Sequence, residues 1–557
     1  MDILNKRVMQ SLNEKNIDTS ASQTGNGPWQ RKILPILPGG LIAAVFFCVG
    51  FLCLSDYGIT WDEKETYLAG FVNLEIIRAF WSSASITYPW HELTGYYFVF
   101  DSLRGFFADL ICTRWHLLEF AESYHLFHLF LSSLSIYFLY LLVLTVSNSV
   151  RVAFFTALTM ALFPKFLAHA QNNPKDLTAL FVFVMTLYMI VNVVLKGGVL
   201  RSIAAGCLLG LALTTTTLSV FIPLIVLTWM LFAMRSDLDE RMKEYGILLF
   251  FAGIFFYLFW PWLWDAPVTK LFEAVEHVVS FTVSFKTLYF GTIYAGENMP
   301  WHYFIMTFIV VTPVFYLFCF VISPVILYRI FFNKKEKIKL LAILGFGWAG
   351  CLVAVEMCVS SHYDGIRHFL PVIPAYCILV AVGIENIFVV ANKINFKRLS
   401  RKTVPVLVYV FIGLSYFQIL LSLITIHPYQ NAYLNEITNY FIKDNAENYF
   451  ETEYWGQTYR EGALWLNQNI EENATVCVPK STSASFVMNY YLDKEAPPAF
   501  SADFFYDTST PKYLLLLSRK ANYKNFMHKI NAEYLPVYTI RRQKGSLVKI
   551  FKNTEKR

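Results

Sequence analysis

Charge is scarce in this chain. Asp, Glu, Lys and Arg make up 15% of its 557 residues, whereas soluble domains usually carry about 25%. No long block of Lys and Arg occurs, so the modest net charge of +6 indicates no nucleic-acid partner. The 9 cysteines form no CxxC pair and no Cys/His zinc spacing, so neither a disulfide framework nor a structural metal is indicated. The polar first 31 residues also lack the pattern of a cleavable signal peptide.

Hydrophobic residues are abundant instead, at 56%, and they recur in runs of about 20 residues. This pattern predicts a polytopic α-helical membrane protein with about eleven transmembrane helices. The boundary between the fifth and sixth runs is weakly marked. The expected spans are 33–54, 123–146, 152–168, 177–195, 202–219, 220–234, 246–264, 302–331, 340–358, 369–390 and 404–426.

Lys and Arg are concentrated in alternate short loops, which predicts the orientation of the chain. Residues 1–31 are expected to be a disordered cytoplasmic N-terminus, and 32–426 to be the transmembrane domain, with a large first outer loop at 55–122. Residues 427–557 are expected to form a small extracytoplasmic α/β domain, which has no glycine-rich nucleotide loop. On this topology every histidine lies on the outer side or at the outer end of a span, so the chemistry is expected at the outer face.

The first outer loop begins with an acid pair in "GITWDEKETYLAG". Thr60 and Glu63 have the spacing of a helix capping box, and Asp62 would lie in the first helical turn. A structural role alone would explain both acids. The functional interpretation is that Asp62 is a general base at the membrane–water boundary and that Glu63 holds the helix start. We therefore take Asp62 and Glu63 as candidate catalytic residues.

The second outer loop reads "FPKFLAHAQNNPKDL". Asn173 or Asp176 is suited to capping the next span, and that structural role stays open. The functional interpretation groups His169, Lys175 and Asp176 into a polar cluster that faces the same cavity as Asp62. In that reading Asp176 is a second catalytic acid, while His169 and Lys175 bind substrate.

The loop "SSHYDGIRHFLP" holds the one arginine of the short outer loops, Arg367, against the positive-inside trend. Arginine binds phosphate in a bidentate manner, so Arg367 is a candidate phosphate ligand together with Tyr363 and His368. Glu356 lies near the outer end of a span, where an ionisable group is either a site residue or the partner of a nearby Arg or His. His302, in "NMPWHYF", is a further candidate phosphate contact.

Six stretches, in order, resemble the GT-C class of membrane glycosyltransferases, and within it the family of protein O-mannosyltransferases and bacterial lipid A aminoarabinose transferases. They are "WDEKETY", "NPKD", "PWHY", "YDGIRHFLPVIP", "HPYQNAYLNE" and "YWGQTYREGALWLN". The chain departs from the family at "LTTTTLSV", where many relatives carry a basic residue. The resemblance implies a polyprenyl-phosphate-linked sugar donor and an acceptor hydroxyl on a glycan, lipid or protein. It also implies that Asp62 and Asp176 match the catalytic acids of the first and second loops.

These observations and the resemblance together predict an inverting glycosyltransferase. The family resemblance implies that the protein lies in a bacterial inner membrane. Two other classes stay open: a transporter or flippase for a polar lipid, and a non-catalytic envelope scaffold. A transporter usually shows internal repeats, and none is evident here. Paired acids can hold Mg²⁺ or Mn²⁺, although no spacing in the sequence demands a metal.

Overall fold

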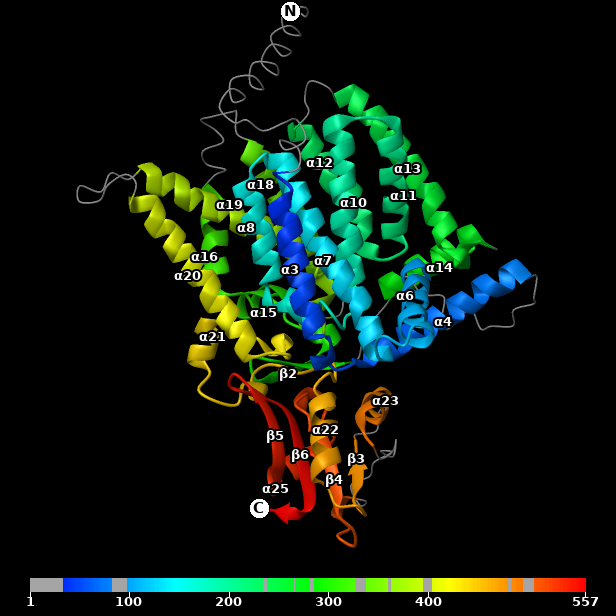
Figure 1. Ribbon diagram of the computed structural model, residues 1–557, viewed down its shortest axis with the longest axis vertical. Helices are drawn as coiled ribbons and strands as arrows, with labels where there is room; N and C mark the ends of the chain where they lie inside the picture. Colours follow the sequence, from blue (N-terminus) through cyan, green and yellow to red (C-terminus); the bar gives the residue numbers. More distant parts are fainter. Residues whose placement is uncertain are drawn as a thin grey trace, which may run out of the picture.

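The computed structural model describes ten stretches of the chain (Figure 1). The expected N-terminal segment 1–31 and part of the first outer loop lie outside them. The described residues are 34–82, 98–233, 238–264, 266–280, 285–325, 337–358, 362–393, 403–478, 482–493 and 505–557.

Apolar helices form the larger part of the described structure. Six are long and apolar enough to cross a membrane, or seven spans if one bent pair counts as a span. The six are α7 (Phe120–Ser147), α10 (Asp176–Lys196), α13 (Leu238–Phe259), α18 (Lys337–Cys358), α19 (Val372–Lys393) and α20 (Thr403–Thr425). Shorter apolar helices are α3 (Leu37–Leu52), α8 (Val150–Ala161), α11 (Val199–Leu213) and α12 (Ile222–Ala233).

Each of the eleven expected spans coincides with one of these helices or with the bent pair, so the helical class is confirmed while the count of eleven stays a prediction. The expected continuous span 302–331 is wrong in one respect. The chain there forms α15 (Tyr303–Val310) and α16 (Val314–Ile322), which meet at 118°. Pro313 causes the break, because proline lacks an N–H and disfavours helical backbone in the residue before it.

The centre of the helical part is formed by α10 and α19. In the most apolar 18-residue segment of each helix, 83% and 89% of the residues are buried. At the periphery, α11 packs closely against α13 through Gly206 and Gly210. A Cβ at Gly206 would lie 2.6 Å from the carbonyl oxygen of Leu248, and one at Gly210 would lie 2.7 Å from the backbone nitrogen of Phe256. Small residues spaced by four let helix backbones approach in this way.

The C-terminal region is a small α/β unit, as the sequence predicts. Its sheet has the order β3-β4-β6-β5, in which only β3 and β4 are parallel. The central strand β4 is buried along its whole length, since helices cover both of its faces. The elements are α22 (Tyr459–Asn469), β3 (Thr475–Cys477), α23 (Thr482–Tyr491), β4 (Lys512–Leu517), α25 (Asn525–Glu533), β5 (Tyr534–Arg542) and β6 (Gly545–Lys556).

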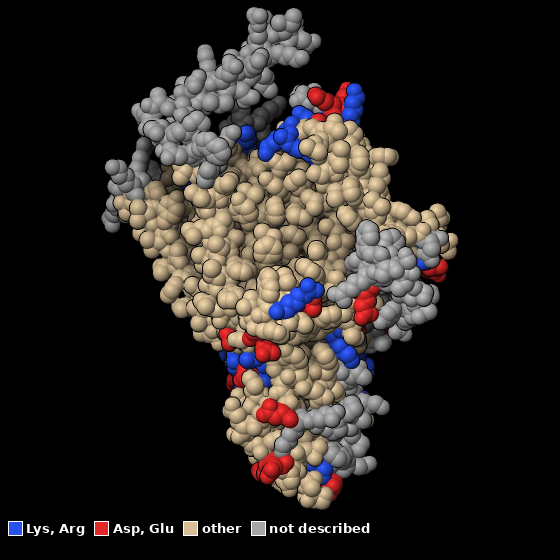
Figure 2. Space-filling model, turned by 45° about the vertical axis from the view of Figure 1, so that its right-hand side comes forward, with Lys and Arg blue, Asp and Glu red and all other residues tan. Residues whose placement is uncertain are grey.

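Charge is unevenly distributed over the surface. Figure 2 shows a broad uncharged band over the helices, with Lys and Arg and some Asp and Glu gathered at the end of the molecule far from the sheet. Acidic and basic residues both occur below the band, around the junction with the α/β unit and on the surface of that unit. Such a band is what the hydrocarbon layer of a membrane requires.

Two helices of the first outer loop lie near that junction, α4 (Trp61–Ser82) and α6 (Phe98–Ala108) (Figure 1). They contact each other at Gly70 and Gly105, where a Cβ on Gly70 would lie 2.7 Å from the carbonyl oxygen of Asp101. The first turn of α4 carries the acid pair of the sequence motif. A short hairpin, β1 (Lys286–Tyr289) and β2 (Thr292–Ala295), precedes α15.

Candidate functional site

Glu63 closes the start of α4 and faces the protein interior. Its Oε1 accepts the backbone N–H of Thr60 at 2.7 Å and the Thr60 hydroxyl at 3.1 Å, which confirms the expected contact between the two residues. Its Oε2 contacts the hydroxyl of Tyr67 and, at 3.0 Å, Nε2 of His125. Both oxygens of this fully buried carboxylate are therefore engaged within the fold. This geometry suits positioning of the helix start more than contact with a substrate.

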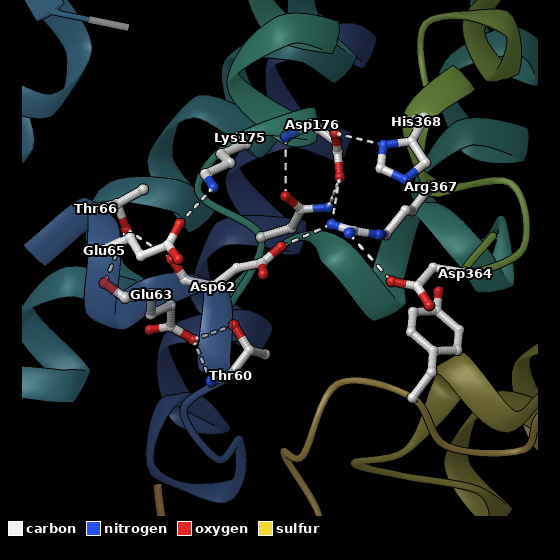
Figure 3. Close-up of polar contacts among 12 residues, drawn as sticks. Thr60, Asp62, Glu63, Glu65, Thr66, Lys175, Asp176, Asp364, Arg367 and His368 are labelled. Atoms are coloured by element: carbon white, nitrogen blue, oxygen red, sulfur yellow. Dashed lines mark hydrogen bonds and ion pairs between the residues drawn. The ribbon is translucent and has the colours of Figure 1, made fainter. Parts of the chain in front are cut away.

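Asp62, the preceding residue, points to the other side and meets a cation (Figure 3). Nη1 of Arg367 donates to its Oδ2 at 2.7 Å. Burial alone would raise the pKa of Asp62, but the charges of Arg367 and Lys175 outweigh it and hold that pKa below its ordinary value. Asp62 is therefore ionised at neutral pH, and 21% of its side chain stays exposed.

Asp176, the first residue of α10, reaches the same guanidinium from the second outer loop. Its Oδ2 lies 3.5 Å from Nη1 of Arg367, and its Oδ1 lies 3.9 Å from Nδ1 of His368. Asn173 holds it from both ends: the Asn173 side chain accepts the backbone N–H of Asp176 and donates to its Oδ2, each at 2.9 Å. Asn173 thus satisfies the helix start, which leaves the Asp176 carboxylate aimed at Arg367.

Arg367 has a third carboxylate partner, Asp364, whose Oδ2 lies 3.1 Å from Nη2. The other oxygen of Asp364 accepts from Nη2 of Arg519 at 2.5 Å. Arg519 belongs to the loop after β4, so this contact links the α/β unit to the site. Burial alone would lower the pKa of Arg367, but the carboxylates of Asp62, Asp364 and Asp176 raise it well above its ordinary value. We call these four residues, Asp62, Asp176, Asp364 and Arg367, the acid–arginine cluster.

Three further predicted residues lie at the rim of the acid–arginine cluster. Lys175 is one-third exposed and pairs with Glu65, with 3.3 Å between Nζ and Oε2. The ring of Tyr363 lies 4.6 Å from that of His368 and 5.6 Å from the guanidinium of Arg367. Burial, and then the charge of Arg367, lower the pKa of His368 well below its ordinary value. The neutral imidazole is therefore the favoured form of His368, and it can still contact a substrate through its ring nitrogens.

His169 lies behind the acid–arginine cluster. It is fully buried, with Nδ1 3.2 Å from the amide nitrogen of Asn173 and its ring edge-on to Trp455 at 4.9 Å. Trp455 in turn lies 5.1 Å from the guanidinium of Arg367. His169 therefore supports Asn173 and the floor of the site.

The two remaining predicted binding residues lie elsewhere. Nδ1 of His302 lies 2.7 Å from the hydroxyl of Tyr289, at the end of the hairpin β1–β2. Glu356, near the end of α18, has its Oε1 2.9 Å from Nδ1 of His362, which is the pairing with a nearby histidine that the sequence left open. Neither residue has a contact with the acid–arginine cluster among the described interactions.

A buried arginine that the sequence did not single out supports the second loop. Arg104 of α6 is fully buried and donates to the carbonyl oxygen of Pro174 at 2.7 Å and to the Thr178 hydroxyl at 3.2 Å. Its charge is balanced by Asp101 at 2.5 Å. The i, i+3 spacing of Asp101 and Arg104 in "FDSLRG" was the one signal in the sequence that they could pair.

Positive charge between Asp62 and Asp176 comes from Arg367 in this arrangement. Mg²⁺ prefers carboxylate and other oxygen ligands, and a guanidinium already occupies the space between these two carboxylates. Among the described residues, the one group of three metal-ligating side chains with donor atoms close together lies elsewhere, at Cys53, Asp56 and His427.

In structural terms the protein is an apolar helical protein of the kind that crosses a membrane, with the acid–arginine cluster where the helices meet an α/β unit. Residues 119–264 match the model of the dolichyl-phosphate-mannose-protein mannosyltransferase family. This segment runs from the start of α7 to just beyond α13 and includes the second-loop motif with Asp176. The match bears out the resemblance to this family, and of the six stretches that carried it, "NPKD" lies inside the matched segment. No curated protein sequence matches the chain.

Several solved structures are similar in overall arrangement. ArnT from Cupriavidus metallidurans bound to undecaprenyl phosphate is 14% identical, with 92% of this chain and 97% of that chain covered and a TM-score of 0.46. The archaeal oligosaccharyltransferase AglB from Archaeoglobus fulgidus, in complex with an inhibitory peptide and a dolichol-phosphate, is 12% identical. There the coverage is 87% of this chain and 70% of that chain, with a TM-score of 0.47.

Proposed function

We propose that this protein is a glycosyltransferase that moves a sugar from a polyprenyl-phosphate-linked donor to an acceptor hydroxyl, with inversion at the anomeric carbon. The observation that carries the proposal is the contact of Arg367 with Asp62 and Asp176, which come from two different outer loops. Such a site offers a cation for a phosphate and a carboxylate for a hydroxyl. The donor class is supported by the matching family, whose name specifies a dolichyl-phosphate sugar.

We place the reaction at the outer face of a membrane, with the N-terminus cytoplasmic and the α/β unit of 427–557 on the opposite side. The Lys and Arg residues of the alternate short loops favour this orientation. The acid–arginine cluster lies at the other end of the helices, near the start of α4 (Figure 1). A bacterial inner membrane is the compartment we propose.

A site at this boundary suits a lipid-linked donor. The polyprenyl tail needs the lipid phase, whereas the sugar and the acceptor need water, and the two phases meet at the junction of helices and α/β unit. A phosphate leaving group develops negative charge as the bond to the anomeric carbon breaks, and a fixed cation stabilises that charge. Arg367 supplies this cation, and Lys175 supplies a second one at the exposed rim.

Asp62 is the proposed general base. It is ionised, partly exposed and held rigidly by the capped start of α4, so it can accept the proton of the attacking hydroxyl. A single displacement by that hydroxyl inverts the anomeric carbon. Asp176 orients Arg367, and Glu63 positions the helix start that carries Asp62.

The test is transfer from a radiolabelled polyprenyl-phosphate sugar by the purified protein in detergent. We expect Asp62→Asn to lower the rate by about 10²- to 10⁴-fold, the usual contribution of a general base. The matched control is Asp239→Asn, an exposed aspartate in the first turn of α13. Equal rates for Asp62→Asn and the wild type would remove Asp62 as the base.

Two further measurements, lipid movement in vesicles and the cellular phenotype of a triple variant, separate the other two classes. A transporter or flippase would move its lipid across vesicles without releasing free polyprenyl phosphate. A scaffold would keep its cellular role when Asp62, Asp176 and Arg367 are all replaced by alanine. Either result would contradict the proposed transferase.

A further inference from the structure

A second cluster of polar side chains lies apart from the acid–arginine cluster, where the first apolar helix ends. It consists of Cys53, Asp56 and His427, whose ligand atoms all lie within 4.8 Å of one another. The closest pair is Nε2 of His427 and Oδ2 of Asp56, at 2.9 Å. These three residues come from two segments that are more than 370 positions apart in the chain.

Local backbone structure places Cys53 and Asp56 side by side. The two residues are three apart, and a 3₁₀ turn, Leu54–Asp56, connects them, with the Asp56 N–H donating to the Cys53 carbonyl at 3.0 Å. In a 3₁₀ turn, side chains three residues apart lie one above the other. His427 reaches them from the segment that follows α20.

Thiolate, imidazole and carboxylate are the three ligand types that Zn²⁺ takes in proteins. In a tetrahedral zinc site, bond lengths of about 2.0–2.3 Å separate neighbouring ligand atoms by about 3.3–3.6 Å. The observed atoms need to shift by only several tenths of an ångström to about one ångström to reach this spacing. Asp56 is 48% exposed and His427 is 29% exposed, so an ion can enter from water and keep one water ligand.

The other ring nitrogen of His427, Nδ1, faces the amide nitrogen of Gln430; a metal-bound histidine donates from that ring nitrogen, so binding through Nε2 requires the Gln430 amide to turn its oxygen toward it. Nδ1 lies 3.2 Å from the side-chain amide of Gln430, which also accepts a hydrogen bond from the hydroxyl of Tyr57 at 3.0 Å. The Tyr57 ring packs edge-on against the imidazole at 5.5 Å. These contacts fix the orientation of the imidazole toward Cys53 and Asp56.

We propose that Cys53, Asp56 and His427 bind one Zn²⁺ ion. The ion would join the end of α3 to the segment that leads into the α/β unit, and it would hold the turn Leu54–Asp56, which shortly precedes Thr60 and α4. Its role is structural, because these residues lie outside the acid–arginine cluster. The proposal is independent of the proposed transferase activity.

Cobalt titration of the full-length protein in detergent, after removal of metals with a chelator, tests this site. We expect one equivalent of Co²⁺ to bind, with a thiolate-to-cobalt charge-transfer band that Zn²⁺ abolishes by displacement. Cys53→Ser should lose the band. Cys48→Ser, which changes an exposed cysteine on the same helix, should keep it.

Thermal unfolding provides a second readout, because it also compares the wild-type protein with and without Zn²⁺. Zn²⁺ should raise the unfolding temperature of the chelated wild type and of Cys48→Ser, and should leave that of His427→Gln unchanged. Absence of the charge-transfer band in a folded wild-type protein would overturn the proposal. So would a band of equal strength in Cys53→Ser, because another cysteine would then hold the ion.

Discussion

Asp364 offers a sharp test of how the α/β unit is held to the site. Its carboxylate lies between Arg367 and Arg519, with one oxygen toward each guanidinium, at 3.1 and 2.5 Å. The side chain of Asp364 is 4% exposed, and those of the two arginines are 8% and 11% exposed, so solvent screens these pairs little. We predict that Asp364→Asn lowers the free energy of unfolding and loosens the α/β unit.

The expected size of the effect follows from the charges. Two unit charges about 4 Å apart attract by about 4 kcal/mol at an effective dielectric constant of about 20, and Asp364 has two such partners. The cost of removing the carboxylate from water offsets part of this gain, so the expected loss is about 3–5 kcal/mol, as for other broken buried pairs. Asp364 has φ +54. Asparagine tolerates this backbone conformation, so the substitution changes the charge without adding backbone strain.

Denaturant unfolding in detergent and hydrogen exchange of β4 and the loop with Arg519 measure the effect. Asp493→Asn is the matched control, because Asp493 is an exposed aspartate of the α/β unit. We expect little change for the control. The double variant Asp364→Asn with Arg519→Met should be more stable than the sum of the single changes predicts, since it removes the cation that has lost its partner. Additive effects, or a loss below about 1 kcal/mol for Asp364→Asn, would refute the bridging role.

Three further predictions concern other buried groups. Arg104→Met should lower the unfolding free energy by about 3–5 kcal/mol, because it leaves the buried Asp101 without its partner; denaturant unfolding measures this. Burial raises the pKa of Glu451 to about 7. A raised pKa favours folding at low pH, so the wild type should lose about 3 kcal/mol relative to Glu451→Gln as the pH rises from about 4.5 to about 7. Thr60→Ala should cost about 1 kcal/mol in thermal unfolding, because the start of α4 loses its hydroxyl partner for Glu63.

Sequence patterns predicted the features that depend on residues close together in the chain, namely the helices and the start of α4. The contact of Thr60 with Glu63 follows from the spacing of a capping box, and the apolar runs coincide with helices. The loop arginine, Arg367, stood out because its charge opposes the orientation trend. Arg519 had no such signal, since its partner Asp364 lies 155 positions away. His302 was chosen for its residue type and its place in "NMPWHYF", and neither specifies which loops meet in space.

Carboxylates already balance the charge of Arg367 before any donor binds. Arg367 faces three carboxylates, so a donor phosphate can reach it only if one carboxylate yields its place. Asp364 is the least able to move, since it is 4% exposed and also holds Arg519. Asp176 is 12% exposed and is fixed by Asn173. Asp62, at 21%, is the most exposed of the three and has one contact with the guanidinium to give up.

Donor binding should therefore free Asp62 from Arg367 and raise its pKa. The charge that holds that pKa below its ordinary value is then shared with the phosphate, which makes Asp62 a stronger base when the acceptor arrives. Activity requires the ionised carboxylate, so it is lost as the pH falls through the pKa of Asp62. The acid limb of kcat/KM, which reports the free enzyme, should lie at lower pH than the acid limb of kcat, which reports the donor complex. Coincident limbs, or limbs in the reverse order, would show that the donor phosphate does not compete with Asp62 for Arg367.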